Sequence, residues 1–428
     1  MQAKVWLGLI LALVTMTARA DLEVTVTGGE TGALPIALVP FADPMGVNFD
    51  VAKIVEADLT RTGQFRALAR SDMLEKPSQP SQVNLADWRQ VNMDNLVMGQ
   101  IRRDPSGKIG VRFYLMDTVR GQQLIAYDMP LAAPEQLRYV AHQISDLIYE
   151  KLIGIKGDFN TRIAYVTATG LGVTRRFALV VADADGFGPH VLVTSREPIM
   201  SPAWSPDHTR LAYVGFDHGR SAIYIQTVAT GEVHKLISEK GINGSPAWSP
   251  DGHKIAITLS FETNPDIYII DLDSGARRRL TTLSSIDTEA AWSPDGQTLV
   301  FTSDRGGQPQ IYQMPVSGGD PKRLTFQGKQ NLRASYSPDG KSLVLVNYDN
   351  SVYRIALLDL ASGNMRILSD GPLDESPGFS PNGSVIIYAT QGNQGAELAT
   401  VSVDGRVKLR MRQPGGDVRE PAWSSLSP

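Results

Sequence analysis

Short runs of apolar residues recur along the last two thirds of the chain, each bounded by polar turn residues. Three of them are Arg210–Val214 (RLAYV), Lys254–Thr258 (KIAIT) and Thr298–Thr302 (TLVFT). Runs of this length rich in β-branched residues predict buried β-strands. Ahead of each stands an aromatic residue and a turn such as Ser-Pro-Asp-Gly, in which proline presets the second position and glycine relieves the fourth. The pattern therefore predicts a series of hairpins.

The aromatic residues that open these hairpins are almost evenly spaced. Successive copies lie 44, 44, 44, 43 and 44 residues apart. A period of 40 to 50 residues with several strands per unit is typical of a β-propeller, in which each repeat is a four-stranded blade. We expect the aromatics to pack between neighbouring blades, with ligand stacking as the minor alternative; they are Trp204, Trp248, Trp292, Tyr336, Phe379 and Trp423.

The two ends of the repeat array are offset from each other. Arg162–Val166 matches the second strand of a repeat with no aromatic turn before it, whereas Pro421–Ser424 matches the first strand with no hairpin after it. Each end lacks what the other supplies. We therefore expect the last strand to complete the first blade, so that six blades close into a ring without an open sheet edge.

The region before the propeller follows a different pattern, which predicts a small α/β domain with a mixed sheet and the order β-α-β-α-β-β-β-α. Apolar positions recur at helical spacing from Val51 to Leu59, after Asn48 or Asp50 as a helix cap. A longer amphipathic helix starts at Pro134 and ends at Gly154. The predicted organisation is a signal peptide at 1–20, a mobile N-terminal segment at 21–33, the α/β domain at 34–158 and the six-bladed propeller at 159–428.

The segment 21–33 is strand-like at first and then rich in glycine. Leu22, Val24 and Val26 alternate with polar residues, and three glycines fall between positions 28 and 32. Glycine at this density lowers the cost of detaching a segment, so the segment could dock and undock. A plain edge strand with a flexible tail is the alternative, and the sequence leaves both open.

Composition and charge narrow the class of protein. Lys4, an apolar run from Val5 to Val14 and the small residues around Ala18 predict a cleaved secretory signal. Its removal takes the formal net charge from −4 to −6, which argues against nucleic-acid and anionic-membrane partners. The chain has no cysteine, hence neither disulfides nor a lipoprotein anchor. We expect a monomer in the periplasm with no direct membrane insertion.

A search for catalytic or metal-binding motifs predicts neither enzyme nor cofactor. No serine stands in Gly-x-Ser-x-Gly, and no pair of the six histidines has the spacing of a zinc protease. His208 replaces glycine in one blade turn, and Gly340-Lys341-Ser342 reads as a turn rather than a phosphate-binding loop. A secreted hydrolase with its pocket in the propeller channel remains the alternative function.

One repeat position varies where packing alone would favour uniformity. Symmetry places the residues three before each aromatic around one mouth of the ring, and they differ in charge and size. Such variation on a rigid rim indicates a binding face, with ordinary inter-blade linkers as the alternative. The residues are Ser201, Ser245, Glu289, Arg333, Ser376 and Glu420.

Together, the signal peptide, the α/β domain and the repeats resemble the TolB family of the Tol-Pal system over nearly the whole mature chain. The segments Leu152–Gly157 (LIGIKG) and Thr161–Val166 (TRIAYV) carry the specific part of the likeness. The resemblance implies a non-enzymatic periplasmic adaptor that supports outer-membrane integrity and constriction during division. It also implies two partners, the Pal lipoprotein at the propeller mouth and TolA at the N-terminal segment.

The resemblance also implies which residues meet each partner. The Pal contacts would be Asn243, Gly244, Ser245, Thr288, Glu289, Asp374 and Glu375. The TolA contacts would be Asp21, Leu22, Glu23, Val24 and Val26. Family members can carry histidine before the Asn-Gly pair, where this chain has Ile242, so one polar Pal contact would differ here.

Overall fold

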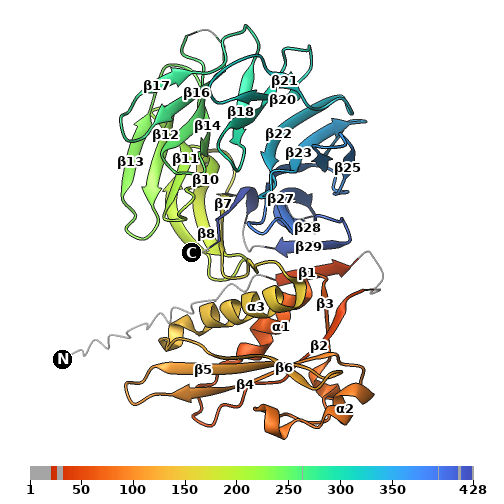
Figure 1. Cartoon of the computed structure of the whole chain (residues 1–428). Coiled ribbons are helices and arrows are strands. Elements are labelled where there is room, and N and C mark those ends of the chain that lie inside the picture. The colour runs from red at the N-terminus through yellow and green to blue at the C-terminus, as the bar shows by residue number, and fades with distance from the viewer. Residues whose placement is uncertain (1–20, 27–31, 263, 394, 413–415, 427–428) are drawn as a thin grey trace, which may run out of the picture.

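The computed structural model describes residues 21–26, 32–262, 264–393, 395–412 and 416–426. It shows a β-propeller above a smaller α/β domain, with helix α3 lying between the two (Figure 1). The predicted signal peptide and the glycines at 28 and 29 lie outside the described residues. Among the described residues, no helix has both the length and the apolarity needed to cross a bilayer.

The N-terminal domain is built on a five-stranded mixed sheet, as the sequence predicts. Its strand order is β3-β2-β4-β5-β6, in which β2 runs parallel to β3 and β4 while the other pairs are antiparallel. The strands are β2 (Leu34–Leu38), β3 (Phe65–Ala67), β4 (Asn95–Arg103), β5 (Ile109–Asp117) and β6 (Gln122–Asp128). Predicted and observed elements agree in order and type.

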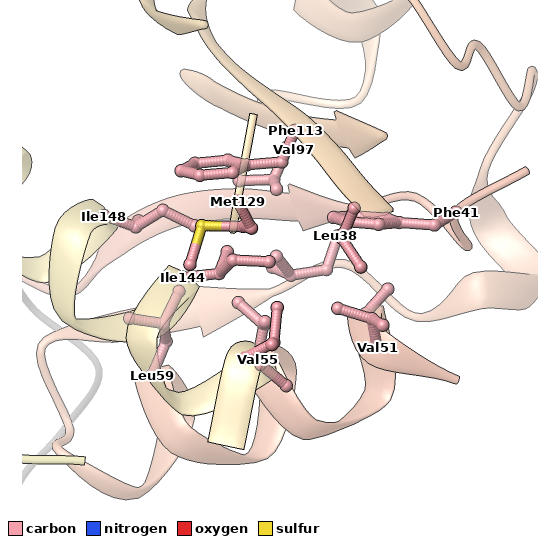
Figure 2. Close-up of a cluster of buried hydrophobic side chains, with 14 of the residues drawn as sticks. Leu38, Phe41, Val51, Val55, Leu59, Val97, Phe113, Met129, Ile144 and Ile148 are labelled. Carbon is pink, nitrogen blue, oxygen red and sulfur yellow. The ribbon is translucent and has the colours of Figure 1, made fainter. Parts of the chain in front are cut away.

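Two helices cover one face of this sheet. Helix α1 (Val51–Arg61) begins at Asp50, whose carboxylate accepts a hydrogen bond from the Lys53 amide at 3.0 Å. Helix α3 (Leu137–Ile153) ends at Gly154, which has the left-handed φ of 88° that favours glycine at this position. Figure 2 shows side chains of both helices, such as Val55 and Ile144, meeting Val97 and Phe113 of the sheet. This apolar layer is the core of the domain.

Short helices complete the domain. Helix α2 (Leu85–Gln90) places Trp88 in a second buried cluster, against residues of β2 and β4. Single 3₁₀ turns lie at η1 (Arg70–Asp72), η2 (Pro80–Gln82) and η3 (Pro134–Gln136), and a fourth, η4 (Gly172–Thr174), lies in the propeller.

The propeller consists of six blades, each an antiparallel sheet numbered here from the channel outward. The first three blades are β30 (Asp417–Trp423), β7 (Arg162–Thr169), β8 (Arg176–Asp183), β9 (His190–Ser195); β10 (Met200–Trp204), β11 (Arg210–Asp217), β12 (Arg220–Thr227), β13 (Val233–Ile237); and β14 (Asn243–Trp248), β15 (Lys254–Leu259), β16 (Asp266–Asp271), β17 (Arg277–Arg279). The next three are β18 (Asp287–Trp292), β19 (Thr298–Ser303), β20 (Gln310–Pro315), β21 (Lys322–Arg323); β22 (Gln330–Tyr336), β23 (Ser342–Asp349), β24 (Val352–Asp359), β25 (Met365–Ile367); and β26 (Asp374–Phe379), β27 (Val385–Gly392), β28 (Gly395–Ser402), β29 (Val407–Arg412).

Closure of the ring occurs where the sequence predicts it. Strand β30 pairs with β7 in antiparallel register, so that Trp423 lies opposite Ile163. The Ser424 amide donates to the Arg162 carbonyl at 2.8 Å, and the Trp423 indole donates to Thr161 Oγ1 at 2.8 Å. The C-terminal strand thereby joins the first blade to the last, and the prediction of closure at these residues is confirmed.

The repeating aromatics join neighbouring blades, which also confirms the sequence prediction. The indole of Trp248 donates to the carbonyl of Ala203 at 3.1 Å, and that of Trp292 donates to Ala247 at 3.0 Å. Each acceptor belongs to the innermost strand of the preceding blade. Trp248 and Trp292 are also buried within clusters that combine residues of adjacent blades. The aromatics therefore have a structural role between the blades.

A fifth strand extends the last blade. Strand β1 (Asp21–Val26) pairs antiparallel with β29, with Asp21 opposite Arg412 and Val26 opposite Val407. In Figure 1 it lies at the edge of the propeller nearest the small domain. Residues 21–26 are thus paired with the propeller, an arrangement that both alternatives for this segment allow.

Candidate functional site: the open mouth of the propeller

One mouth of the propeller faces the small domain and the other is open. On the first side, the Asn382 amide donates to the Lys156 carbonyl at 3.1 Å, and His208 lines a cavity together with Arg138 and His142 of the small domain. Both Asn382 and His208 belong to turns that follow an innermost strand. The connections that precede the innermost strands must lie at the opposite end, which we call the open mouth.

Buried polar residues fix the connections at the open mouth. The position five before the aromatic is Asn243, Asp287, Asn331 or Asp374 in four blades, and all four side chains are buried. Asn243 accepts from the Glu239 amide and donates to the Glu239 carbonyl, both at 2.8 Å. These bonds close the connection on itself, so that Asn243 shapes the loop and does not present its side chain to solvent.

Two aspartates have the same role. Asp374 accepts hydrogen bonds from Ser369 Oγ at 2.5 Å, from the Gly371 amide at 3.0 Å and from Thr390 Oγ1 at 2.6 Å. Asp287 accepts two bonds from the Arg305 guanidinium, at 2.8 and 2.9 Å. A buried carboxylate saturated in this way stabilises a defined loop. The Asp374 side chain is therefore engaged within its own blade, and the contact of this residue with Pal stays a prediction.

The residues three before each aromatic line the channel instead of its outer rim. All six have a left-handed backbone, with φ between 48° and 57°. The pairing register breaks beside each of them, as between Gly244 and Ala247, and such bulges redirect a side chain away from its regular position. The wall of the channel, a cavity of about 690 Å³, includes five of the six, Ser201, Ser245, Glu289, Arg333 and Ser376, and the sixth, Glu420, is paired with Arg333.

The channel contains paired charges. Arg333 Nη2 lies 2.8 Å from Glu420 Oε2, and the same oxygen accepts from the Ser201 amide at 2.6 Å. Burial alone would raise the pKa of the Glu420 carboxyl, but Arg333 and Ser201 outweigh it and lower that pKa. Glu289 accepts from Thr302 Oγ1 at 2.9 Å, and Arg419 pairs with Glu375 at 3.2 Å. Charge thus lies at the centre of the mouth.

Exposed apolar side chains surround this charged centre. Ile242 and Ile286 are each 49% exposed, and Leu283 is 55% and Phe326 74% exposed. All four lie in connections that precede innermost strands. Because large apolar side chains are costly to leave in water, a group of them around one opening marks an interaction surface. Sequence reasoning missed three of the four, although Ile242 and Ile286 share the repeat position six before the aromatic.

Another connection adds two apolar residues to this mouth. Leu171 and Val173, between β7 and β8, are 85% and 98% exposed. Arg175 of the same connection lies 3.7 Å from Asp417, which begins the innermost strand β30. The apolar rim therefore comprises Leu171, Val173, Ile242, Leu283, Ile286 and Phe326.

Comparison with known proteins decides the family. A model described as "TolB beta propeller domain" matches residues 149–427, and one described as "TolB amino-terminal domain" matches residues 22–124. The chain belongs to the TolB family. A relative named Tol-Pal system protein TolB, from Methylococcus capsulatus, is 60% identical over 420 residues, covering 98% of each chain. The protein of that name from Thioalkalivibrio sulfidiphilus is 58% identical, covering 97% of this chain and 96% of its own.

Solved structures agree with this assignment. The crystal structure of TolB from Acinetobacter baumannii covers 95% of this chain and 100% of its own, with 40% identity and a TM-score of 0.88. The fold described above is therefore that of a TolB protein along nearly its whole length.

Within this TolB fold, the residues expected to contact Pal fall into two groups. Asn243 and Asp374 are buried and hold loops, whereas Gly244, Ser245, Thr288, Glu289 and Glu375 are partly exposed at or inside the mouth. The two loops 243–245 and 288–289 belong to adjacent blades. The residues expected to contact TolA all lie in strand β1. This strand is the outermost of the five in its blade, at the edge farthest from the channel.

Proposed function

We propose that this TolB protein is a non-enzymatic adaptor of the periplasm that binds Pal at the open mouth and TolA through β1. In this role it supports outer-membrane integrity and constriction during cell division. The observation that carries the proposal is the apolar rim around a charged channel entrance, on the propeller face that the small domain leaves uncovered.

The composition of the mouth supports a protein partner. Stable protein interfaces combine an apolar part with polar and charged groups that give orientation, and a few central residues supply most of the affinity. Here Ile242, Leu283, Ile286 and Phe326 would supply the apolar contacts. Ser245, Thr288, Glu289 and Glu375 would supply polar contacts, while Asn243 and Asp374 keep the loops in place.

The position of β1 supports a second, exchangeable contact. It is the outermost strand of its blade, and within the described part of the chain it pairs with β29 alone. A strand that is paired at one edge can detach from its sheet and form the same backbone hydrogen bonds with a partner protein. It can also stay in place and pair with a partner's strand at its free edge. If Pal binding biases whether β1 is docked, TolA binding must bias Pal affinity to the same extent.

Calorimetry with purified Pal tests the rim. Ile286→Asp should weaken Pal binding by about 2 kcal/mol, a loss typical of an interface hot spot. Ile367→Asp is the matched control, because Ile367 is 47% exposed but lies in the outer strand β25. An equal effect of both variants, or no effect of either, would contradict the assignment of Pal to this mouth.

Deletion of residues 21–26 tests the TolA contact. The deleted protein should lose TolA binding in a pulldown while it retains the fold, because β1 is an added fifth strand on a blade that already has four. Unchanged TolA affinity would refute this part of the proposal. A pulldown from periplasmic extract also separates the adaptor from the alternative of a secreted hydrolase in the channel, since only the adaptor must retain Pal.

A further inference from the structure

A buried histidine with one unsatisfied ring nitrogen lies where the two domains meet. His142 of α3 is 3% exposed, and its Nδ1 lies 2.7 Å from Asp58 Oδ2 of α1. Its Nε2 has no hydrogen-bond partner among the residues that the structure describes, and it lies 4.0 Å from Asp183 Oδ2, at the end of propeller strand β8. One nitrogen is thus held by the small domain while the other points towards the propeller.

The surroundings of Asp58 orient the imidazole. Asp58 Oδ2 also accepts a hydrogen bond from Ser145 Oγ at 2.8 Å, and Asp58 Oδ1 lies 3.3 Å from Arg61. A carboxylate that serves as acceptor in this way accepts its third hydrogen bond from the Nδ1–H of the imidazole. The lone pair of His142 is then on Nε2, the nitrogen without a partner.

Two carboxylates of the propeller lie near this imidazole. Asp183 and Asp185 come from the end of β8 and the turn that follows it, and ligand atoms of Asp58, His142 and Asp185 all lie within 4.8 Å of one another. His142 and Asp183 also line a cavity of about 560 Å³ between the domains. An imidazole nitrogen with nearby carboxylate oxygens is a donor set that suits zinc and similar cations.

We propose that this junction binds a divalent transition-metal cation of the zinc type, with His142 Nε2, Asp183 and Asp185 as ligands. Asp58 is the positioning residue, because a carboxylate on the second ring nitrogen orients a metal-binding histidine and makes it a better ligand. The imidazole favours Zn²⁺, Co²⁺ or Ni²⁺ over Ca²⁺ and Mg²⁺, which prefer oxygen ligands alone. The cation would join α3 to the propeller.

Arg138 competes for the same carboxylates. Its Nε lies 3.2 Å from Asp183 Oδ2, and its Nη2 is paired with Asp185 Oδ2. A cation must therefore displace this guanidinium from at least one oxygen, which weakens binding. This competition predicts the direction of a mutational effect. Removing Arg138 should increase the affinity for the metal, although it also removes an ion pair between the domains.

The experiment uses the untagged protein after treatment with a chelator. Calorimetry with ZnCl₂ should show one equivalent bound, and CoCl₂ should give the visible absorption of a protein-bound Co²⁺ ion. His142→Asn keeps an amide near the Nδ1 position but lacks Nε2, and should abolish the signal. Asp58→Asn should weaken binding about 10- to 100-fold. Arg138→Gln should bind more tightly than the parent, and Ca²⁺ should give no heat.

A second histidine–aspartate pair supplies the matched control. His253 Nδ1 lies 2.8 Å from Asp273 Oδ2, but both side chains are mostly exposed and no further carboxylate is grouped with them among the described residues. His253→Asn should leave zinc and cobalt binding unchanged. No stoichiometric binding by the parent, or equal binding by His142→Asn, would overturn the proposal. If circular dichroism shows that His142→Asn is unfolded, Asp185→Asn provides the same test from the propeller side.

Discussion

Arg333 and Glu420 form an ion pair inside the propeller channel, 2.8 Å apart. Their strands, β22 and β30, belong to two blades that have another blade between them. Their side chains are only 33% and 19% exposed. The pair therefore links the innermost strand of the fifth blade to that of the blade completed by the C-terminal strand, past the innermost strand of the last blade. It also sets the charge that a partner meets at the centre of the mouth.

Breaking this ion pair should destabilise the propeller. Arg333→Met leaves Glu420 partly buried without its guanidinium, and we expect a loss of about 2 kcal/mol, since both groups retain some contact with water. Urea unfolding measures the loss. The double variant Arg333→Met, Glu420→Gln should recover part of it, and an equally unstable double variant would show that the charge is not the cause.

The same pair predicts an acid-side dependence of stability. The pKa of Glu420 is lowered in the folded protein, so its contribution is present above the unfolded-state pKa of about 4.3 and is lost as the pH falls below that value. Unfolding free energies between pH 6 and pH 3 should therefore fall less steeply in Glu420→Gln than in the parent. Parallel curves would contradict the assignment.

The buried carboxyl of Asp146 should make stability depend on pH in the opposite direction, with stability falling as the pH rises towards neutrality. Burial raises the pKa of this carboxyl to about 7, assisted by the charges of Asp158 and Asp58 and opposed by the Phe159 amide. A raised carboxyl pKa favours the protonated folded form, so stability should decline from about pH 4 to pH 7 and then level off. Asp146→Asn, which keeps an acceptor for Phe159, should gain roughly 2 to 4 kcal/mol at pH 8. Thermal unfolding from pH 5 to pH 8 checks whether the variant flattens the curve.

The contribution of the Trp248 hydrogen bond to stability can be measured separately from the contribution of its packing. Trp248→Phe removes the hydrogen bond to the Ala203 carbonyl and should cost about 1 kcal/mol. Trp248→Ala also leaves a cavity and should cost about 3 to 5 kcal/mol. Denaturant unfolding measures both changes. A melting temperature unaffected by Trp248→Ala would be incompatible with a core role.

Asn243 should behave as a loop-forming residue and not as a simple contact. Asn243→Ala leaves the partly buried Glu239 amide without its acceptor, and we expect a loss of about 1 to 3 kcal/mol in stability. The exposed rim variant Ile286→Asp should leave stability almost unchanged. Thermal unfolding distinguishes the two, and equal melting temperatures for Asn243→Ala and the parent would refute this role.

The sequence by itself determined the repeat, the number of blades and the point of closure. This was possible because hairpin turns and strands are determined by short stretches of sequence. The same stretch recurs at a nearly fixed period from Trp204 to Trp423. The helices α1 and α3 were predictable for the same reason, since local residues delimit them. Asp50 precedes the first residue of α1, and Gly154 follows the last residue of α3.

Only the tertiary structure decided which mouth residues are available and which are buried. Asn243 and Ser245 stand two positions apart in one strand, yet the first is buried in its loop and the second lines the channel, because a bulge breaks the alternation between them and Ala247. The pairing of β1 with β29 and the approach of His142 to Asp183 join segments far apart in the chain. Such contacts depend on how whole elements pack together, which a local pattern of apolar and polar residues does not encode.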